Sequence, residues 1–261
     1  MSLLLMLADL SMAPLRVLCI HGYRQNGSSF REKTGALRKL LKKHVELVYM
    51  SAPHSVQQAS SEAPEKENGP GDEDSRGWWF SDVQARSFSA QQQCEESLGL
   101  DDSVAAVREA VRVQGPFDGI LGFSQGAAFV AMLCSLQEQK LEPDFSFHFA
   151  ILVAGFPSAC KEHQQFYNPP LQIPSLHVFG LEDRVIPDCM SRELLPSFQD
   201  PQVLIHPGGH FVPAASAHRQ AYQDFFKRFQ TFFRSRGWAL ARTAVVWLYL
   251  KLPYGHYWGK Y

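Results

Sequence analysis

The sequence lacks an excess of either charge. Lys and Arg together number 25 and Asp and Glu number 26, which gives a formal net charge of −1. Proteins that bind nucleic acid usually present a basic face, so we expect no nucleic-acid partner. The length of 261 residues and the 45% hydrophobic content are those of one domain with a substantial core.

The sequence also lacks a cysteine framework. Its five cysteines are an odd number without C-x-x-C spacing, and most lie in apolar stretches such as the one around Cys19. This usage is typical of reduced, buried thiols. Residues 1–13 resemble a signal-peptide core, but the apolar run is short, has no basic residue ahead of it and meets Asp9 early. We therefore expect an N-terminal extension on a cytoplasmic protein, with nuclear access left open.

Cofactor motifs are missing as well. The sequence contains no H-E-x-x-H, no P-loop and no G-x-G-x-x-G. His206 and His210 are four residues apart, but the Pro-Gly-Gly between them prevents a pair of ligands on one helix. We predict neither a metal ion nor a cofactor.

The sequence has no long apolar stretch near its C-terminus. Residues 239–252 fall below the roughly 20 residues that span a bilayer, although their Trp and Tyr neighbours would suit a membrane interface. We favour an atypical aromatic tail at 237–261 over such an anchor. The main domain is then expected at 14–236, interrupted by a mobile acidic loop at 55–76 that is rich in Ser, Glu, Pro, Gly and Gln.

Short apolar runs alternate with helical patterns along the domain. The expected strands are 15–20, 46–50, 117–121, 147–153, 175–179 and 202–206. The expected helices are 30–43, 97–113, 127–139 and a strongly amphipathic one after residue 215. This alternation predicts an α/β fold, a mostly parallel sheet with helices on both faces. The carboxyl ends of its strands would share one edge, where sites gather.

One motif at such a strand end carries chemistry. Gly122-Phe123-Ser124-Gln125-Gly126 matches G-x-S-x-G, a tight strand-to-helix turn that exposes a serine oxygen above the sheet. The pattern is short enough to arise by chance, but here an expected strand precedes it and an expected helix follows it. We predict that Ser124 is a nucleophile.

A serine hydroxyl needs a base to remove its proton, and the base needs an acid to orient it. In proteins with this turn the chain order is Ser, then acid, then His. That order selects His210, in the loop after strand 202–206, from the ten histidines. It places Asp183, after strand 175–179, as the acid, with Glu182 and Asp188 as competitors.

The surroundings of the serine are predicted more loosely. The backbone N–H groups of Tyr23 and Gln125 are candidates for an oxyanion hole. Aromatic residues near the strand ends could bind medium-to-long unbranched acyl chains or could simply pack in the core. These six residues are Trp78, Trp79, Phe80, Phe123, Phe156 and Phe211.

Several separated motifs resemble one family. The segments are 15–26, 31–35, Arg76-Gly77-Trp78-Trp79-Phe80, the turn with its flanks at 115–128, 174–180 and 208–213. They resemble the FSH-type branch (family of serine hydrolases) of the α/β hydrolases, from about Pro14 to Phe233. The resemblance implies the α/β-hydrolase fold and a carboxylesterase that acts through an acyl-enzyme. The aromatic residues named above lead us to expect a small, lipid-like ester as its substrate. It carries Ser124, Asp183 and His210 over as a catalytic triad.

Two other functions stay open. Acyl-protein thioesterases share a G-F-S-Q-G turn with this sequence, so the substrate could be a thioester. The chain could also be a non-catalytic binding protein with a hydrolase fold. The sequence does not indicate an oligomeric state.

Overall fold

The computed structural model describes residues 14–56 and 74–235, with side chains up to residue 230. Its centre is a six-stranded sheet in the order β2-β1-β5-β6-β7-β8, and every neighbouring pair is parallel. The strands are β1 (Leu15–Ile20), β2 (Val45–Met50), β5 (Gly119–Phe123), β6 (Ala150–Val153), β7 (Ser175–Gly180) and β8 (Gln202–His206). This confirms the predicted α/β class.

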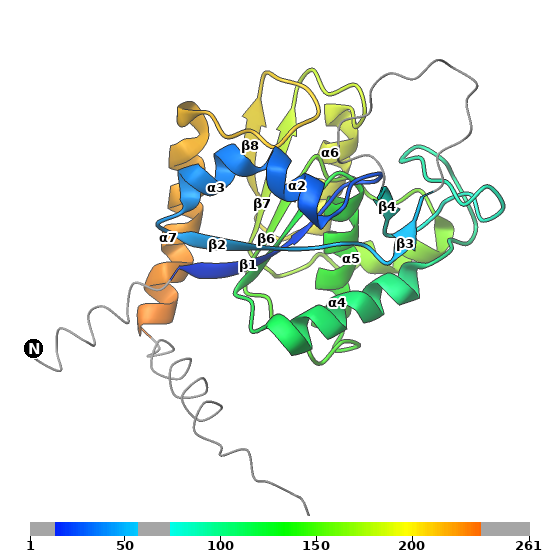
Figure 1. The fold of residues 1–261 in the computed structure, drawn as a ribbon, viewed down its shortest axis with the longest axis horizontal. Coiled ribbons are helices and arrows are strands. Elements are labelled where there is room, and N and C mark those ends of the chain that lie inside the picture. The colour runs from blue at the N-terminus through cyan, green and yellow to red at the C-terminus, as the bar shows by residue number, and fades with distance from the viewer. Residues whose placement is uncertain (1–13, 57–73, 236–261) are drawn as a thin grey trace, which may run out of the picture.

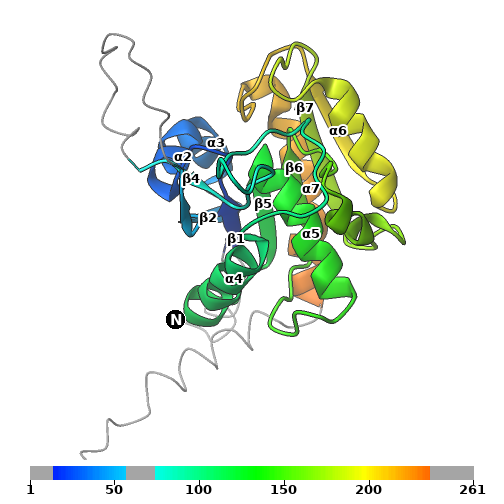
Figure 2. The ribbon, with the colours of Figure 1, turned by 90° about the vertical axis from the view of Figure 1, so that its right-hand side faces the viewer.

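Helices cover both faces of the sheet. They are α2 (Gly27–Lys33), α3 (Gly35–Leu41), α4 (Leu100–Gln114), α5 (Gln125–Glu138), α6 (Asp188–Leu194) and α7 (Arg219–Ser235), with 3-10 turns η1 (Lys161–Tyr167), η2 (Leu195–Ser197) and η3 (Ser216–His218). Helices α3 and α7 lie on one face, and α4, α5 and α6 lie on the other (Figures 1 and 2). Right-handed crossovers explain the placement of α3 opposite α4, α5 and α6, because the connection from β1 to β2 runs along the sheet in the opposite direction to the later ones.

Helices α5 and α7 pack on opposite faces of the sheet. Every residue of α5 from Gln125 to Ser135 is buried, because the helix packs directly on β5 and β6. Helix α7 packs one aromatic stripe on the opposite face, where Phe225, Phe226 and Phe229 surround the ring of Phe149 at 4.6–5.7 Å between centroids. The predicted amphipathic helix is therefore confirmed, and its apolar side faces the core.

One predicted helix, 30–43, is wrong in extent and continuity. The chain forms α2 and α3 instead, which meet at Thr34 with φ −98° and ψ 15°. Helix α2 begins early because Asn26 caps it: its side chain accepts from Ser29 N at 2.8 Å, and Ser29 Oγ accepts from Asn26 N at 3.0 Å. The Thr34 hydroxyl donates back to the Phe30 carbonyl at 2.7 Å, which competes with a continuous helix.

The strand order reverses beside β1. The chain runs from β1 outward to β2, and then returns past β1 to β5 on its other side. The loops that follow β1 and β5 therefore meet at the carboxyl edge of the sheet, the position where open α/β sheets bind ligands.

Several predicted segments lie outside the described residues. The N-terminal extension 1–13, the tail 237–261 and most of the acidic loop are among them. The ends of that loop pair as a short antiparallel ladder between β3 (His54–Ser55) and β4 (Arg76–Gly77). Within residues 14–56 and 74–235, no helix is long and apolar enough to cross a membrane.

Candidate active site

Ser124 occupies a sharp turn between β5 and α5. Its backbone has φ 55° and ψ −121°, a region that non-glycine residues rarely adopt and that costs about 1–3 kcal/mol. Two glycines make the turn possible. A Cβ at Gly122 would overlap the Gly126 carbonyl, and a Cβ at Gly126 would overlap the carbonyl oxygens of Ile20 and His21. The turn is further tied to β6, because Ser124 N donates to Val153 O at 2.8 Å.

Asp183 and His210 come from neighbouring loops. Asp183 follows β7, His210 follows β8, and His210 Nδ1 lies 2.7 Å from Asp183 Oδ2. The other carboxylate oxygen, Oδ1, accepts from the backbone N–H groups of Val185 and Ile186 at 2.9 Å each. The loop backbone therefore holds the carboxylate in one orientation. The competitor Glu182 is exposed, and Asp188 pairs with Arg192 at 2.9 Å.

The environment of Asp183 keeps it ionised. Burial raises the pKa of this carboxyl, but the hydrogen bond from His210, the two backbone donors and the charge of His210 outweigh that effect, so the pKa lies below its ordinary value. An ionised carboxylate can only accept, so Nδ1 of His210 carries the proton of the 2.7 Å bond. The other ring nitrogen, Nε2, is then free to act as an acceptor.

The imidazole of His210 lies beside the serine turn. Its ring is 4.7 Å from the ring of Phe123, the residue directly before Ser124. Among the hydrogen bonds of residues 14–56 and 74–235, none joins Ser124 Oγ to His210. The hydrogen bond between a nucleophile and its base is often long until a substrate is bound. The role of His210 is therefore inferred from the position of its ring beside the serine turn and from its tautomer.

Two backbone donors face no protein acceptor near the turn. A Cβ at Gly22 would come within 3.3 Å of Ser124 Cβ, which places the loop after β1 against the serine. The amides on either side of Tyr23 are used, since Gly22 N donates to Gln25 Oε1 and Arg24 N to Arg76 O. In the described part of the chain, the N–H groups of Tyr23 and Gln125 have no acceptor. Both are thus available to an oxygen at Ser124.

The side chain of Gln125 has a positioning role that the sequence did not reveal. Its Oε1 accepts from Trp78 N at 3.0 Å, and its Nε2 donates to Trp79 O at 2.7 Å. The indole of Trp78 donates to His21 O at 2.7 Å. This buried network joins the serine turn, the loop after β1 and the Trp78–Trp79 segment. The G-x-S-x-G pattern leaves the residue after Ser unspecified, so only the buried amide could have signalled this role.

His21 shapes the loop after β1. Its Nε2 accepts from Ala52 N at 2.9 Å and its Nδ1 contacts Gly22 O at 2.7 Å, so the ring is neutral with the proton on Nδ1. Burial lowers the pKa of His21 to about 4. Both ring nitrogens are occupied, which leaves no lone pair for proton transfer.

The six aromatic residues differ in exposure. Trp78, Trp79, Phe80 and Phe156 are completely buried, Phe123 is nearly so, and Phe211 is 50% exposed. The buried four offer no accessible surface to an acyl chain in this conformation, which supports the packing interpretation for them. Phe123, next to His210, and Phe211 stay predictions as substrate contacts.

A hollow of about 410 Å³ opens near the same edge of the sheet. It lies between the loop after β6, the start of α6 and a segment of residues 90–93. Its lining mixes small, apolar and polar side chains, and includes Ala90, Pro157, Ala159, Pro187 and Met190. The sequence analysis did not single out any of these residues, because none of them carries a chemical motif.

The sequence matches one protein family over most of its length. Residues 10–222 match the family described as Serine hydrolase (FSH1). Esterase OVCA2 of Danio rerio is 70% identical over 227 residues, which cover 85% of this chain and 100% of that protein. Esterase OVCA2 of Homo sapiens is 46% identical over 221 residues, covering 83% and 97%.

Solved structures show the same fold. Acyl-protein thioesterase 2 of Zea mays superposes with a TM-score of 0.55 at 17% identity, covering 82% of this chain and 95% of that one. SOBER1 of Arabidopsis thaliana superposes with a TM-score of 0.52 at 16% identity, covering 83% and 99%. These likenesses, with the parallel sheet and the serine turn, confirm the α/β-hydrolase fold.

Proposed function

Because the chain belongs to the FSH1 family of serine hydrolases, we propose that it hydrolyses carboxylic esters with Ser124 as nucleophile, His210 as general base and Asp183 as the acid that orients the base. The 2.7 Å bond between Asp183 and His210, beside a serine held at φ 55°, carries this assignment. Packing alone does not require this arrangement, in which a buried carboxylate is held by the backbone and bonded to a histidine beside a strained serine.

The proposed reaction follows from the tautomer. Nε2 of His210 accepts the proton of Ser124 while the serine oxygen attacks the ester carbonyl carbon. The imidazolium that results is stabilised by the ionised Asp183. His210 then protonates the departing alcohol, an acyl-enzyme remains, and water activated by the same histidine releases the acid.

The oxyanion of the tetrahedral intermediate needs two donors. We assign them to the backbone N–H groups of Tyr23 and Gln125, since both are free of protein acceptors in the described residues and both border Ser124. The Gln125 side chain holds these two loops in register through Trp78. It therefore acts as a positioning residue rather than a donor to substrate.

We expect the substrate to be a small ester with a medium-to-long unbranched acyl chain. Three large apolar side chains, Leu181, Val185 and Phe211, are 50–56% exposed. They belong to the two loops that carry Asp183 and His210, so they give the site an apolar rim. A series of p-nitrophenyl esters from acetate to palmitate measures this preference, and a maximum at acetate would contradict it.

Labelling with a fluorophosphonate probe tests the nucleophile. The parent protein should label, Ser124→Ala should not, and Ser216→Ala, which changes an exposed serine on η3, should label like the parent. Failure of the folded parent to label would favour a non-catalytic binding protein. Turnover of matched oxygen esters and thioesters then distinguishes an esterase from a thioesterase.

A further inference from the structure

Two cysteines far apart in the sequence are backbone partners at the edge of η1. Cys94 and Cys160 form an isolated parallel bridge. Lys161 N donates to Cys94 O at 2.8 Å, and Glu162 N donates to Glu95 O at 3.2 Å. Paired residues of neighbouring strands lie about 4.8 Å apart and project their side chains to the same side, a separation that a disulfide can span without backbone movement.

The two thiols have different environments. Cys160 is 1% exposed and its Sγ donates to Glu95 O at 3.5 Å, whereas Cys94 is only partly buried. Burial, followed by contact with the Cys94 thiol, raises the pKa of Cys160 to about 12. Cys160 therefore stays protonated and sheltered, and an oxidant meets Cys94 first.

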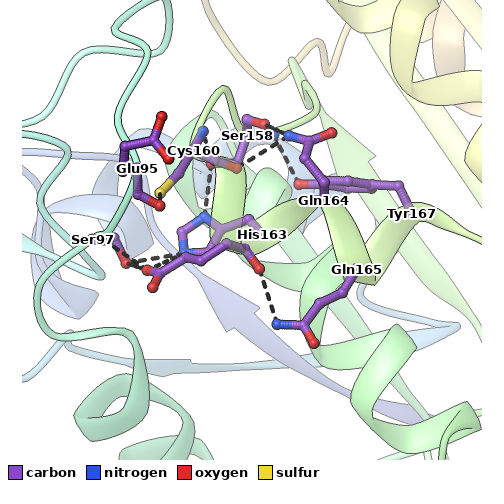
Figure 3. A network of polar contacts seen from close by, with 9 residues as sticks. Glu95, Ser97, Ser158, Cys160, His163, Gln164, Gln165 and Tyr167 are labelled. Atoms are coloured by element: carbon purple, nitrogen blue, oxygen red, sulfur yellow. Dashed lines mark hydrogen bonds and ion pairs between the residues drawn. The ribbon is translucent and has the colours of Figure 1, made fainter.

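A polar network surrounds Cys160 and reaches the segment that follows Cys94 (Figure 3). His163 Nδ1 contacts Ser158 Oγ at 2.8 Å and its Nε2 contacts Ser97 Oγ at 2.9 Å. Ser97 Oγ in turn donates to Glu162 Oε1 at 2.6 Å. Because Ser97 bonds to both Glu162 and His163, the network ties the segment of Cys94 to η1 just after Cys160, next to the backbone bonds of Lys161 and Glu162. These bonds hold the segments of the two thiols side by side.

The same cluster offers an alternative ligand set. Atoms of Cys160, Glu162 and His163 lie within 4.8 Å of one another. In a tetrahedral zinc site, the ligand atoms would lie about 3.5 Å from one another. Both ring nitrogens of His163 are already in hydrogen bonds. The arrangement therefore fits a thiol pair better than a metal site.

We propose that Cys94 and Cys160 form a reversible disulfide when the protein meets hydrogen peroxide. The Cys94 thiolate attacks peroxide, the O–O bond breaks, and Cys94 becomes a sulfenic acid with release of hydroxide. The Cys160 thiol then attacks the Cys94 sulfur and gives its proton to the departing hydroxyl, so that the S–S bond forms, the S–O and S–H bonds break and water leaves. The pair loses two electrons and two protons, and the peroxide is reduced to water.

The disulfide would join the walls of two hollows. Gln91 and Gln93 line the hollow near the carboxyl edge of the sheet, together with Ser158. Ser97 and His163 line a second hollow of about 440 Å³ on the other side of the bridge. Oxidation would thus cross-link the segment around Cys94 to η1 between both hollows, and it would restrict the unfolded chain.

The test treats reduced, full-length protein with hydrogen peroxide and blocks the remaining thiols before mass spectrometry. Apart from the blocking groups, the monomer should be about 2 Da lighter, and two of its five thiols should carry no blocking group. Peptide mapping should join the Cys94 and Cys160 peptides, dithiothreitol should reverse the change, and the oxidised protein should unfold at a higher temperature.

Variants separate the pair from the other thiols. Cys94→Ser should abolish the link, and Cys160→Ala should do so independently; circular dichroism checks that each variant is folded. Cys189→Ser, which removes the exposed thiol on α6, should leave the link intact. Over-oxidation of Cys94 without a link, or a link through Cys189, would overturn the proposal. So would equimolar zinc in the native mass spectrum of the reduced protein.

Discussion

Asparagine at position 183 should change the tautomer of His210 without removing the loop that holds it. Oδ1 of Asp183 accepts from Val185 N and Ile186 N at 2.9 Å each. Asparagine keeps both bonds only with its amide oxygen in that place, and its NH₂ group then faces His210 Nδ1. Since NH₂ only donates, Nδ1 becomes the acceptor and the ring proton moves to Nε2.

A protonated Nε2 cannot take the proton of Ser124. We expect kcat for a p-nitrophenyl ester to fall by about 10⁴-fold, the loss that accompanies a wrong tautomer in a Ser-His-Asp site. The matched control is Glu182→Gln, which neutralises the exposed neighbouring carboxylate and should keep kcat within a few-fold. A folded Asp183→Asn protein that loses less than about tenfold would refute the assignment of Asp183 as the orienting acid.

The same variant has a defined effect on stability against pH. The pKa of Asp183 is lowered in the folded protein, so its ionised form stabilises the fold at pH values above the unfolded pKa, about 3.9. That stabilisation is lost as the pH falls through the folded pKa. The difference in unfolding free energy between parent and Asp183→Asn should therefore shrink in acid, as urea denaturation at several pH values would measure.

Three further predictions concern the support of the site. Gly126→Ala should destabilise the protein by several kcal/mol and abolish labelling, because the new Cβ overlaps backbone oxygens; Gly35→Ala, whose Cβ meets nothing nearer than 3.7 Å, should be close to neutral in urea denaturation. Gln125→Ala should cost about 2–4 kcal/mol by leaving two buried backbone groups without partners, whereas Gln199→Ala, at an exposed position, should cost under about 0.5 kcal/mol. Since burial lowers the pKa of His21 to about 4, the folded state resists protonation there. His21 should then lower the stability by up to about 3 kcal/mol between pH 6.5 and 4, in addition to the effect of buried His177, whose pKa burial lowers to about 3. His21→Gln should therefore reduce the slope of stability against pH without removing it, and an unchanged slope would contradict the role of His21.

Periodicity and chain order predicted the parts of the molecule that obey a repeating rule. The sheet strands were predictable because each is a short apolar run bounded by turn residues. The edge of the sheet that carries Ser124, Asp183 and His210 followed from the direction of the strands. The 2.7 Å contact between Asp183 and His210 brings together the two residues that chain order had selected.

Other features depend on contacts that no local pattern contains. The break at Thr34 arises from a hydroxyl that donates to Phe30 O and contacts Tyr49 Oη at 2.6 Å, and Tyr49 lies on a different element. The buried aromatics near Ser124 were ambiguous, since the same composition suits an acyl pocket and a core. The bridge between Cys94 and Cys160 joins two irregular segments, so the isolated cysteines gave no signal in the sequence.

Folding and chemistry are coupled most tightly at the serine turn. The strained backbone of Ser124 is held by Gly122 and Gly126 against neighbouring carbonyls, by the buried side chain of Gln125, and by a helix whose first eleven residues are all buried. Burying such a helix offsets the 1–3 kcal/mol or so of strain. Substitutions in this turn should therefore lose stability and activity together. The loops of Asp183 and His210 lie outside that core, so changes there can remove activity and leave the fold intact.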